Sequence, residues 1–145
     1  MLFRSAPVSA DVKNVSPALF FSSSEPVSSQ LAAFHANSGV LVDQAHPAAA
    51  GETVEMYGTG LGTTIPAVPA GSPAPFSPPA RTLLVPQAQI GIMPAEVTFS
   101  GLTPGFAGVY QVNVVIPRGL RSGFQSVQWK FGDGTVAASG TIAVQ

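Results

Sequence analysis

Apolar and polar residues alternate along several short stretches of the chain, and this period of two predicts β-strands. In residues 110–116, the side chains of Tyr110, Val112, Val114 and Ile116 share one face, and the polar residues between them lie on the other. Strands of an antiparallel sheet produce this pattern, because one face of the sheet meets the core and the other meets water.

Four further stretches alternate in the same way. Their expected inward-facing side chains are Val54 with Met56, Ala95 with Val97 and Phe99, Val127 with Trp129 and Phe131, and Ile142 with Val144. By the same alternation, we expect Ser100 to face outward and Tyr57 to face away from Val54 and Met56.

Turns containing glycine or proline separate these stretches at short intervals. They lie at Ala36–Gly39, Leu102–Gly105, Pro117–Gly119 and Gly132–Gly134. Short strands with such turns predict an all-β fold, an immunoglobulin-like antiparallel β-sandwich of about seven strands. We place this domain at residues 16–145, and residues 1–15 are either an N-terminal strand of it or a linker from a preceding module.

One segment, Ile65–Ala80, lacks the alternation that predicts strands. It holds six of the 14 prolines and almost no charge. We expect an extended loop that lies over the sandwich as a long crossover between its sheets. A flap that covers a ligand, or a strap that docks a partner, is the functional alternative.

The composition narrows the classes of function. Charged residues make up 9% of the chain, against about 25% in ordinary soluble domains, and the six basic residues are scattered, so no nucleic-acid surface is expected. The absence of cysteine excludes disulfides and thiol chemistry.

No apolar run is long enough for a membrane span, and residues 1–7 lack the apolar core of an export signal. The neutral polar surface suits a secreted or cell-surface protein, so we expect the chain to be part of a longer one with its signal upstream.

The stretch Tyr57–Thr64 has glycines at alternate positions, which raises the possibility of a phosphate-binding loop. Such a loop needs a helix directly after the glycines, so that backbone amides converge on the phosphate. Here a Thr-Thr-Ile-Pro sequence follows Gly62, and no lysine follows the last glycine. A strand that ends in glycine turns is therefore the favoured interpretation.

Few residues offer catalytic or metal-binding chemistry. His35 and His46 flank Asp43, but their spacing follows no metal-site pattern. No Gly-x-Ser-x-Gly motif is present, and neither histidine has an evident triad partner. We therefore expect no enzyme, no cofactor and no metal, with a small hydrolase based on a histidine as the minor alternative.

Three aromatic residues are the candidate ligand contacts. Tyr57 lies on the outward face of its strand, and Phe76 and Phe106 lie in loops. Exposed aromatic rings provide flat platforms for sugar rings, which would make the chain a carbohydrate-binding module. The simpler alternative is that Phe106 plugs the end of the sandwich and Phe76 holds the proline-rich segment in place.

Several segments together resemble one known family. They are Ser16–Phe20, Val54–Gly62, Ile90–Val97, Gly101–Pro117 and Thr141–Val144. Their order is similar to the Solibacter-type uncharacterised C-terminal domain, abundant in large exported proteins of Acidobacteria. The chain departs from the family's usual Gly-Gly turn near the last hairpin, where it has Phe131–Gly134. The resemblance implies an immunoglobulin-like module that follows other surface domains, with no established activity or catalytic residues.

These observations favour a non-catalytic structural or adhesive module of an exported or cell-surface bacterial protein. Its expected partners are neighbouring domains of a longer chain, and a polysaccharide or protein at the cell surface. A carbohydrate-binding module that uses exposed aromatic residues is the alternative.

Overall fold

The computed structural model describes residues 5–22, 29–137 and 139–145. Within these ranges the chain forms eleven β-strands, and no helix is long and apolar enough to cross a membrane. The strands are β1 (Ala18–Leu19), β2 (Ala33–His35), β3 (Thr53–Thr59), β4 (Thr64–Ile65), β5 (Arg81–Thr82), β6 (Gln87–Ile90), β7 (Met93–Ala95), β8 (Val97–Leu102), β9 (Tyr110–Val115), β10 (Gly123–Lys130) and β11 (Gly140–Val144).

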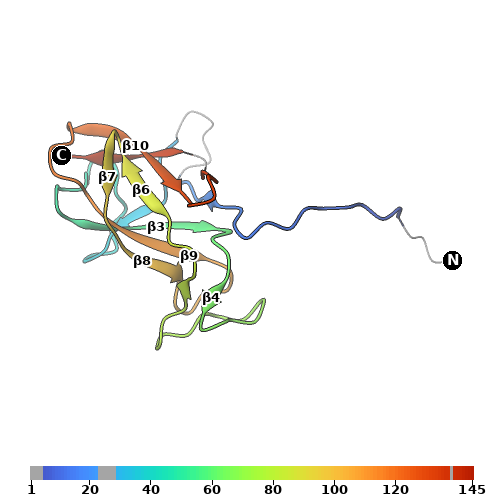
Figure 1. The fold of residues 1–145 in the computed structure, drawn as a ribbon. Coiled ribbons are helices and arrows are strands. Elements are labelled where there is room, and N and C mark those ends of the chain that lie inside the picture. The colour runs from blue at the N-terminus through green and yellow to red at the C-terminus, as the bar shows by residue number, and fades with distance from the viewer. Residues whose placement is uncertain (1–4, 23–28, 138) are drawn as a thin grey trace.

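The strands form two antiparallel sheets that pack as a sandwich (Figure 1). One sheet has seven strands in the order β1-β3-β9-β8-β5-β4, with β2 also paired to β3, and the other has four in the order β11-β10-β6-β7. The predicted all-β, immunoglobulin-like sandwich is confirmed. The structure has more strands than the seven expected, because the larger sheet includes very short strands. β1, β4 and β5 have two residues each.

The core lies between the two sheets and follows the predicted alternation. Val54, Met56, Val112 and Val114 contribute from β3 and β9, whose registers match Val54 to Val114 and Met56 to Val112. The opposing sheet contributes fully buried residues such as Trp129. Burial of these large apolar side chains is the main stabilising contribution to the fold.

On β8, the side chains of Phe99 and Ser100 point to the opposite sides of the sheet from those predicted. Val97 pairs with Val114, but Phe99 pairs with Asn113, so Thr98 is an extra residue that forms a β-bulge. The bulge turns Ser100 inward, where its hydroxyl lies 2.7 Å from that of Thr82. Phe99 turns outward instead, and the Arg81 guanidinium lies 4.9 Å from its ring centre.

The alternating glycines after Tyr57 allow the N-terminal segment to cross close to the end of β3. A Cβ atom at Gly58 would lie 2.6 Å from the Ala18 carbonyl oxygen, and a Cβ atom at Gly60 would overlap the carbonyl oxygen of Ser16. Gly60 also has φ of 75°, which favours glycine. β4 follows instead of a helix, so the interpretation of these glycines as a strand end is confirmed.

Residues 5–14 form no strand and extend away from the sandwich (Figure 1). The chain joins the sandwich at Val15, whose side chain is buried in the core. The Ser16 amide then donates to the Gly60 carbonyl oxygen at 2.8 Å. The role of the N-terminal residues as a linker from a preceding module stays a prediction.

The proline-rich segment Ile65–Ala80 is not the expected crossover. It leaves the seven-stranded sheet after β4 and returns to the same sheet at β5, so it forms a long excursion between two paired strands. It projects from the end of the molecule at which β4 lies (Figure 1). The change of sheet comes later, between β5 and β6.

Candidate functional site

The outer face of the seven-stranded sheet carries the candidate site. Along β3, Val54 and Met56 face the core, so Glu55 and Tyr57 face outward. Phe34 on β2 is the cross-strand partner of Glu55, and it therefore lies on the same outward face.

An aromatic groove of about 340 Å³ opens on this face, and its walls are almost wholly apolar. Four rings line it: Phe20, Phe34, Tyr57 and Phe106. We call this feature the aromatic groove. Its volume lies near the lower end of the range for small-molecule sites.

Two parts of the fold form the groove. On one side, a chain of backbone hydrogen bonds joins three lining residues: Ala32 N–H donates to Phe20 O at 2.8 Å, Phe20 N–H to Tyr57 O at 3.0 Å, and Tyr57 N–H to Ala32 O at 3.3 Å. On the other side, the loop between β8 and β9 supplies Thr103, Phe106 and Val109. Strands and a loop that are distant in sequence therefore converge on one site.

The loop that carries Phe106 is held from two directions. Its own backbone closes through Phe106 N–H to Thr103 O at 3.1 Å and Thr103 N–H to Val109 O at 2.8 Å. The proline-rich segment adds Ala74 N–H to Phe106 O at 2.9 Å. The segment therefore braces one wall of the aromatic groove.

The Tyr57 ring is held by two contacts. It meets the Phe34 ring edge to face, with ring centres 5.7 Å apart, and its hydroxyl donates to Glu55 Oε2 at 3.0 Å. Burial, this hydrogen bond and the negative charge of Glu55 raise the pKa of Tyr57 to about 12. Tyr57 is therefore a neutral phenol with its proton on the Glu55 side.

A polar row adjoins the aromatic groove on the same face. Gln111 and Asn113 on β9 are the cross-strand partners of Tyr57 and Glu55. The Gln111 side-chain amide donates to Asn113 Oδ1 at 2.8 Å. Groups that form hydrogen bonds thus lie beside the apolar groove, and its walls contain almost none.

The structure brings together two of the three aromatic residues that the sequence singled out. Tyr57 and Phe106 both line the aromatic groove, whereas Phe76 is outside its lining. Phe106 is 58% exposed, so it does not plug the sandwich end. Phe76 is 79% exposed, and its ring lies 3.1 Å from where a Cβ atom of Gly105 would be.

Sequence reasoning missed Phe20, Phe34 and Thr103. In the structure, Leu19 next to Phe20 and Ala33 next to Phe34 are buried, which places both rings outward. Residues 17–21 and 31–34 are apolar at every position, so the sequence contains no alternation that would have revealed this. Thr103 gave no signal. Its hydroxyl oxygen is buried and has no hydrogen-bond partner among the described residues.

The two histidines lie in separate pairs and do not form one metal cluster. His35 Nδ1 contacts Glu52 Oε1, whereas His46 Nδ1 lies 3.1 Å from Asp43 Oδ1. Hydrogen bonds, the largest from the His46 backbone amide, lower the pKa of Asp43. Among the described residues, no three metal-ligating side chains gather around a common point.

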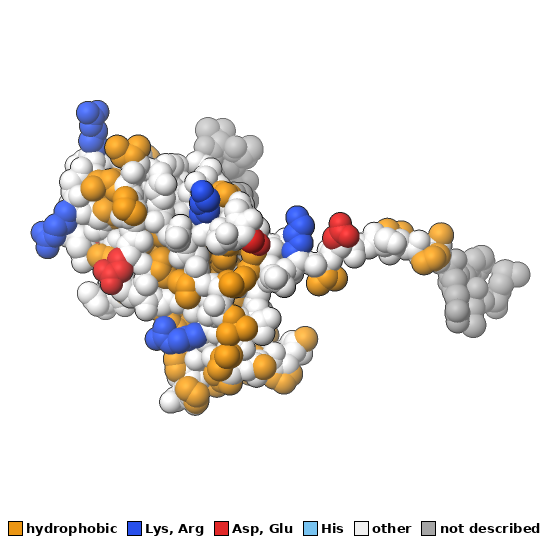
Figure 2. All heavy atoms as spheres, viewed as in Figure 1, with side chains coloured by type: hydrophobic (Ala, Val, Ile, Leu, Met, Phe, Trp, Pro, Cys, Tyr) orange, Lys and Arg blue, Asp and Glu red, His pale blue; other side chains and the backbone are white. Residues whose placement is uncertain are grey.

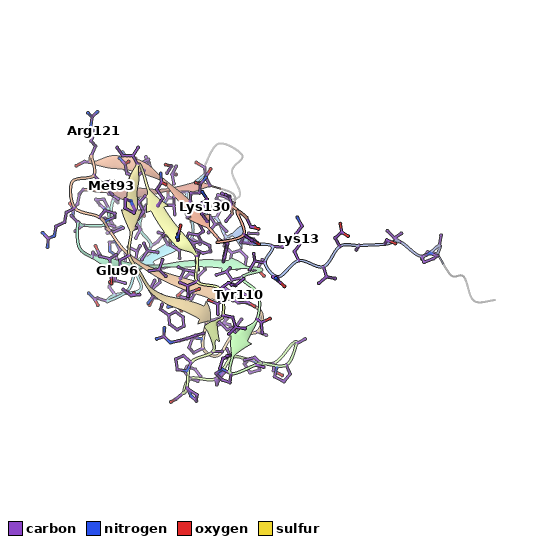
Figure 3. The ribbon with its side chains drawn as sticks, viewed as in Figure 1. Lys13, Met93, Glu96, Tyr110, Arg121 and Lys130 are labelled. Carbon is purple, nitrogen blue, oxygen red and sulfur yellow. The ribbon has the colours of Figure 1, made fainter. Side chains whose placement is uncertain are left out.

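Charged side chains are dispersed over the face of the molecule that Figure 2 shows. On the face drawn in Figure 2, basic and acidic groups stand apart and form no patch. Figure 3 shows Lys13, Arg121 and Lys130 on different parts of the molecule. On the face drawn there, this distribution offers no focused field for a highly charged polymer.

Comparisons of the chain with models of protein families, with curated proteins and with solved structures find no match. The similarity of its segments to the Solibacter-type C-terminal domain therefore stays a prediction.

Proposed function

We propose that the chain is a non-catalytic structural or adhesive module of an exported or cell-surface bacterial protein, attached to its partner through the aromatic groove. The observation that carries the proposal is the gathering of four aromatic rings on an outward sheet face. Aromatic residues are enriched at protein interfaces, where a few residues contribute most of the binding energy. Contiguous exposed apolar surface on a soluble domain is typical of an interaction site.

The surroundings of the groove support binding rather than catalysis. Its lining has Tyr57 as the one titratable side chain, and the phenol proton is engaged by Glu55. A nucleophile with an adjacent base, which covalent catalysis requires, is missing from the lining residues. The low charge and the resemblance to exported domains support an extracellular setting beside neighbouring domains of a longer chain.

Bead adhesion tests the proposal. Beads coated with the chain are washed over immobilised bacterial envelope fragments, and the retained fraction is counted. We expect Phe106→Ser to lower retention by at least about fivefold, because it removes a ring from the groove. Phe124→Ser is the matched control, since Phe124 is similarly exposed, at 52%, but lies on β10 of the other sheet. Equal loss with both variants, or no retention of the original chain, would count against the proposal.

A carbohydrate-binding module is the second candidate, and the polar row favours it. Gln111, Asn113 and Glu55 could hydrogen-bond the hydroxyl groups of a sugar that stacks on Tyr57. Native gels containing cell-wall or plant polysaccharides test this candidate directly. Retardation by one polysaccharide, weakened by Tyr57→Ser and Gln111→Ala, is the expected result, and unchanged mobility in all of them would remove the candidate.

A further inference from the structure

We propose that the aromatic groove binds an organic cation whose charge is covered by alkyl groups, of the quaternary ammonium class. The inference rests on the proposed function, because it names the ligand chemistry of the same site. Three features of the groove carry it: apolar walls, four aromatic rings and an adjoining carboxylate.

The apolar walls select against ligands that need many hydrogen bonds. Among the groove's lining side chains, only Tyr57 and Thr103 have a polar atom, and the Thr103 hydroxyl is buried. A sugar hydroxyl or peptide amide placed in the groove would lose water without gaining a partner. A trimethylammonium group has no N–H or O–H to satisfy, so apolar walls do not penalise it in this way.

The aromatic rings favour a positive charge. The face of an aromatic ring carries negative charge density, and cations bind over it at short range. The same sheet face already contains such a contact, because Arg81 lies 4.9 Å from the ring centre of Phe99. Arg81 is on β5, three strands from β3, and none of the lining residues of the groove is basic.

Glu55 supplies the net negative charge. It accepts a hydrogen bond from the Tyr57 hydroxyl at 3.0 Å and is the cross-strand partner of Phe34, so it lies beside two of the four rings. Among the residues that the structure describes, no basic side chain forms an ion pair with Glu55. A carboxylate without a counter-ion beside an apolar aromatic groove is complementary to a lipophilic cation.

The Tyr57 proton stays in place at neutral pH, because burial and the Glu55 carboxylate raise the pKa of the phenol to about 12. The hydrogen bond therefore points from Tyr57 to Glu55, and the carboxylate increases the electron density of the ring. The pair thus favours a cation in the groove without a negative charge on the phenol itself.

An NMR titration with two matched probes tests the proposal. Choline chloride carries the trimethylammonium group, and 3,3-dimethylbutan-1-ol has the same shape without the charge. Each is added to the ¹⁵N-labelled chain, with sodium chloride as the ionic-strength control. We expect choline to shift the amides of Phe20, Phe34, Tyr57 and Phe106, and to bind at least about fivefold more tightly than the neutral probe.

Two charge variants make the test specific. Glu55→Gln keeps an acceptor for the Tyr57 hydroxyl, and it should reduce the preference for choline to less than about twofold. Glu96→Gln is the control, since Glu96 lies beside the end of β8 that is remote from the groove loop (Figure 3). If Glu55→Gln fails to fold, Phe20→Leu replaces it, because that change keeps apolar volume and removes one ring.

Each outcome decides the proposal. Choline preference that depends on Glu55 or Phe20 supports it, and equal binding of the two probes, or no groove shifts with choline, overturns it. Bead retention that depends on Phe106, together with no choline binding, would overturn this inference and leave the adhesive function standing. Groove shifts with a polysaccharide but not with choline would assign the site to sugars instead.

Discussion

At the scale of single residues, Gly60 must be a glycine because the N-terminal segment packs directly against its backbone. Its φ is 75°, and a Cβ atom there would overlap the Ser16 carbonyl oxygen. Gly71 has a similar φ of 80° but open space around the Cβ position. Substitution of Gly71 by alanine would therefore introduce backbone strain alone, whereas the same substitution at Gly60 would add steric overlap.

We expect Gly60→Ala to lower the free energy of unfolding by about 3 kcal/mol or more, because strain and overlap add. Gly71→Ala should cost only about 1 kcal/mol, since strain alone acts there. Urea denaturation followed by Trp129 fluorescence measures both. Equal losses for the two variants would mean that the N-terminal segment does not pack closely on Gly60.

The protonation state of His35 follows from its two neighbours. Nδ1 faces the Glu52 carboxylate, and Nε2 lies 3.1 Å from the His46 carbonyl oxygen, so both nitrogens face acceptors. An imidazole can donate to both only when it is doubly protonated. Burial lowers the pKa of His35, but these hydrogen bonds and the charges of Glu52 and Asp43 outweigh it, and the pKa is raised above 6.5.

A histidine with a raised folded-state pKa stabilises the protein below its ordinary pKa and loses this contribution as pH rises through the folded-state value. The difference in free energy of unfolding between the original chain and His35→Gln should therefore shrink between about pH 6 and pH 8. Urea denaturation at a series of pH values measures this difference. His46→Gln should leave the trend intact, and a difference that is constant or grows with pH would contradict the assignment.

At the scale of elements, the sequence predicts most accurately those strands that contain no bulge themselves. β9 lies between β3 and β8 in the larger sheet, and the buried faces of β3 and β9 follow the alternation. β8 departs from it because the bulge at Thr98 depends on the pairing with β9. Local alternation cannot reveal an unpaired residue in a ladder.

The candidate site could be predicted in part, because local alternation and loop positions are visible in the sequence whereas long-range strand pairing is not. Alternation alone places Tyr57 outward, and a loop position makes Phe106 exposed. The meeting of these rings with Phe20 and Phe34 depends on β1 and β2 both pairing with β3. These contacts join residues far apart in the chain, which the pattern of one strand does not encode.

Truncation tests where the N-terminal element begins. Deletion of residues 2–13 should change the free energy of unfolding by less than about 0.5 kcal/mol, because the described part of this stretch is exposed. Deletion of residues 2–19 should cost more than about 3 kcal/mol, because it removes the buried side chains of Val15 and Leu19. Urea denaturation measures both variants. A large loss with the shorter deletion would show that the extended segment packs on the sandwich.

At the scale of the whole molecule, the two outer faces of the sandwich differ in chemistry. The seven-stranded sheet presents the aromatic groove, and the outer face of the four-stranded sheet presents polar side chains such as Gln87, Gln89 and Gln128. The chain has 9% charged residues and a net charge of −1, so we do not expect either face to attract a partner through a strong electrostatic field. The apolar groove thus distinguishes one face from the other, and it is the surface that we propose binds the partner.

NMR line broadening tests most directly whether the chain binds its partner through the aromatic groove, as we propose. Isolated bacterial envelope fragments are added to the ¹⁵N-labelled chain, and the amide signals that broaden are mapped on the structure. We predict that broadening concentrates at Phe20, Phe34, Tyr57 and Phe106, and that Phe106→Ser abolishes it. Broadening centred on Phe124 and Gln128 of the other sheet, or none at all, would contradict the account.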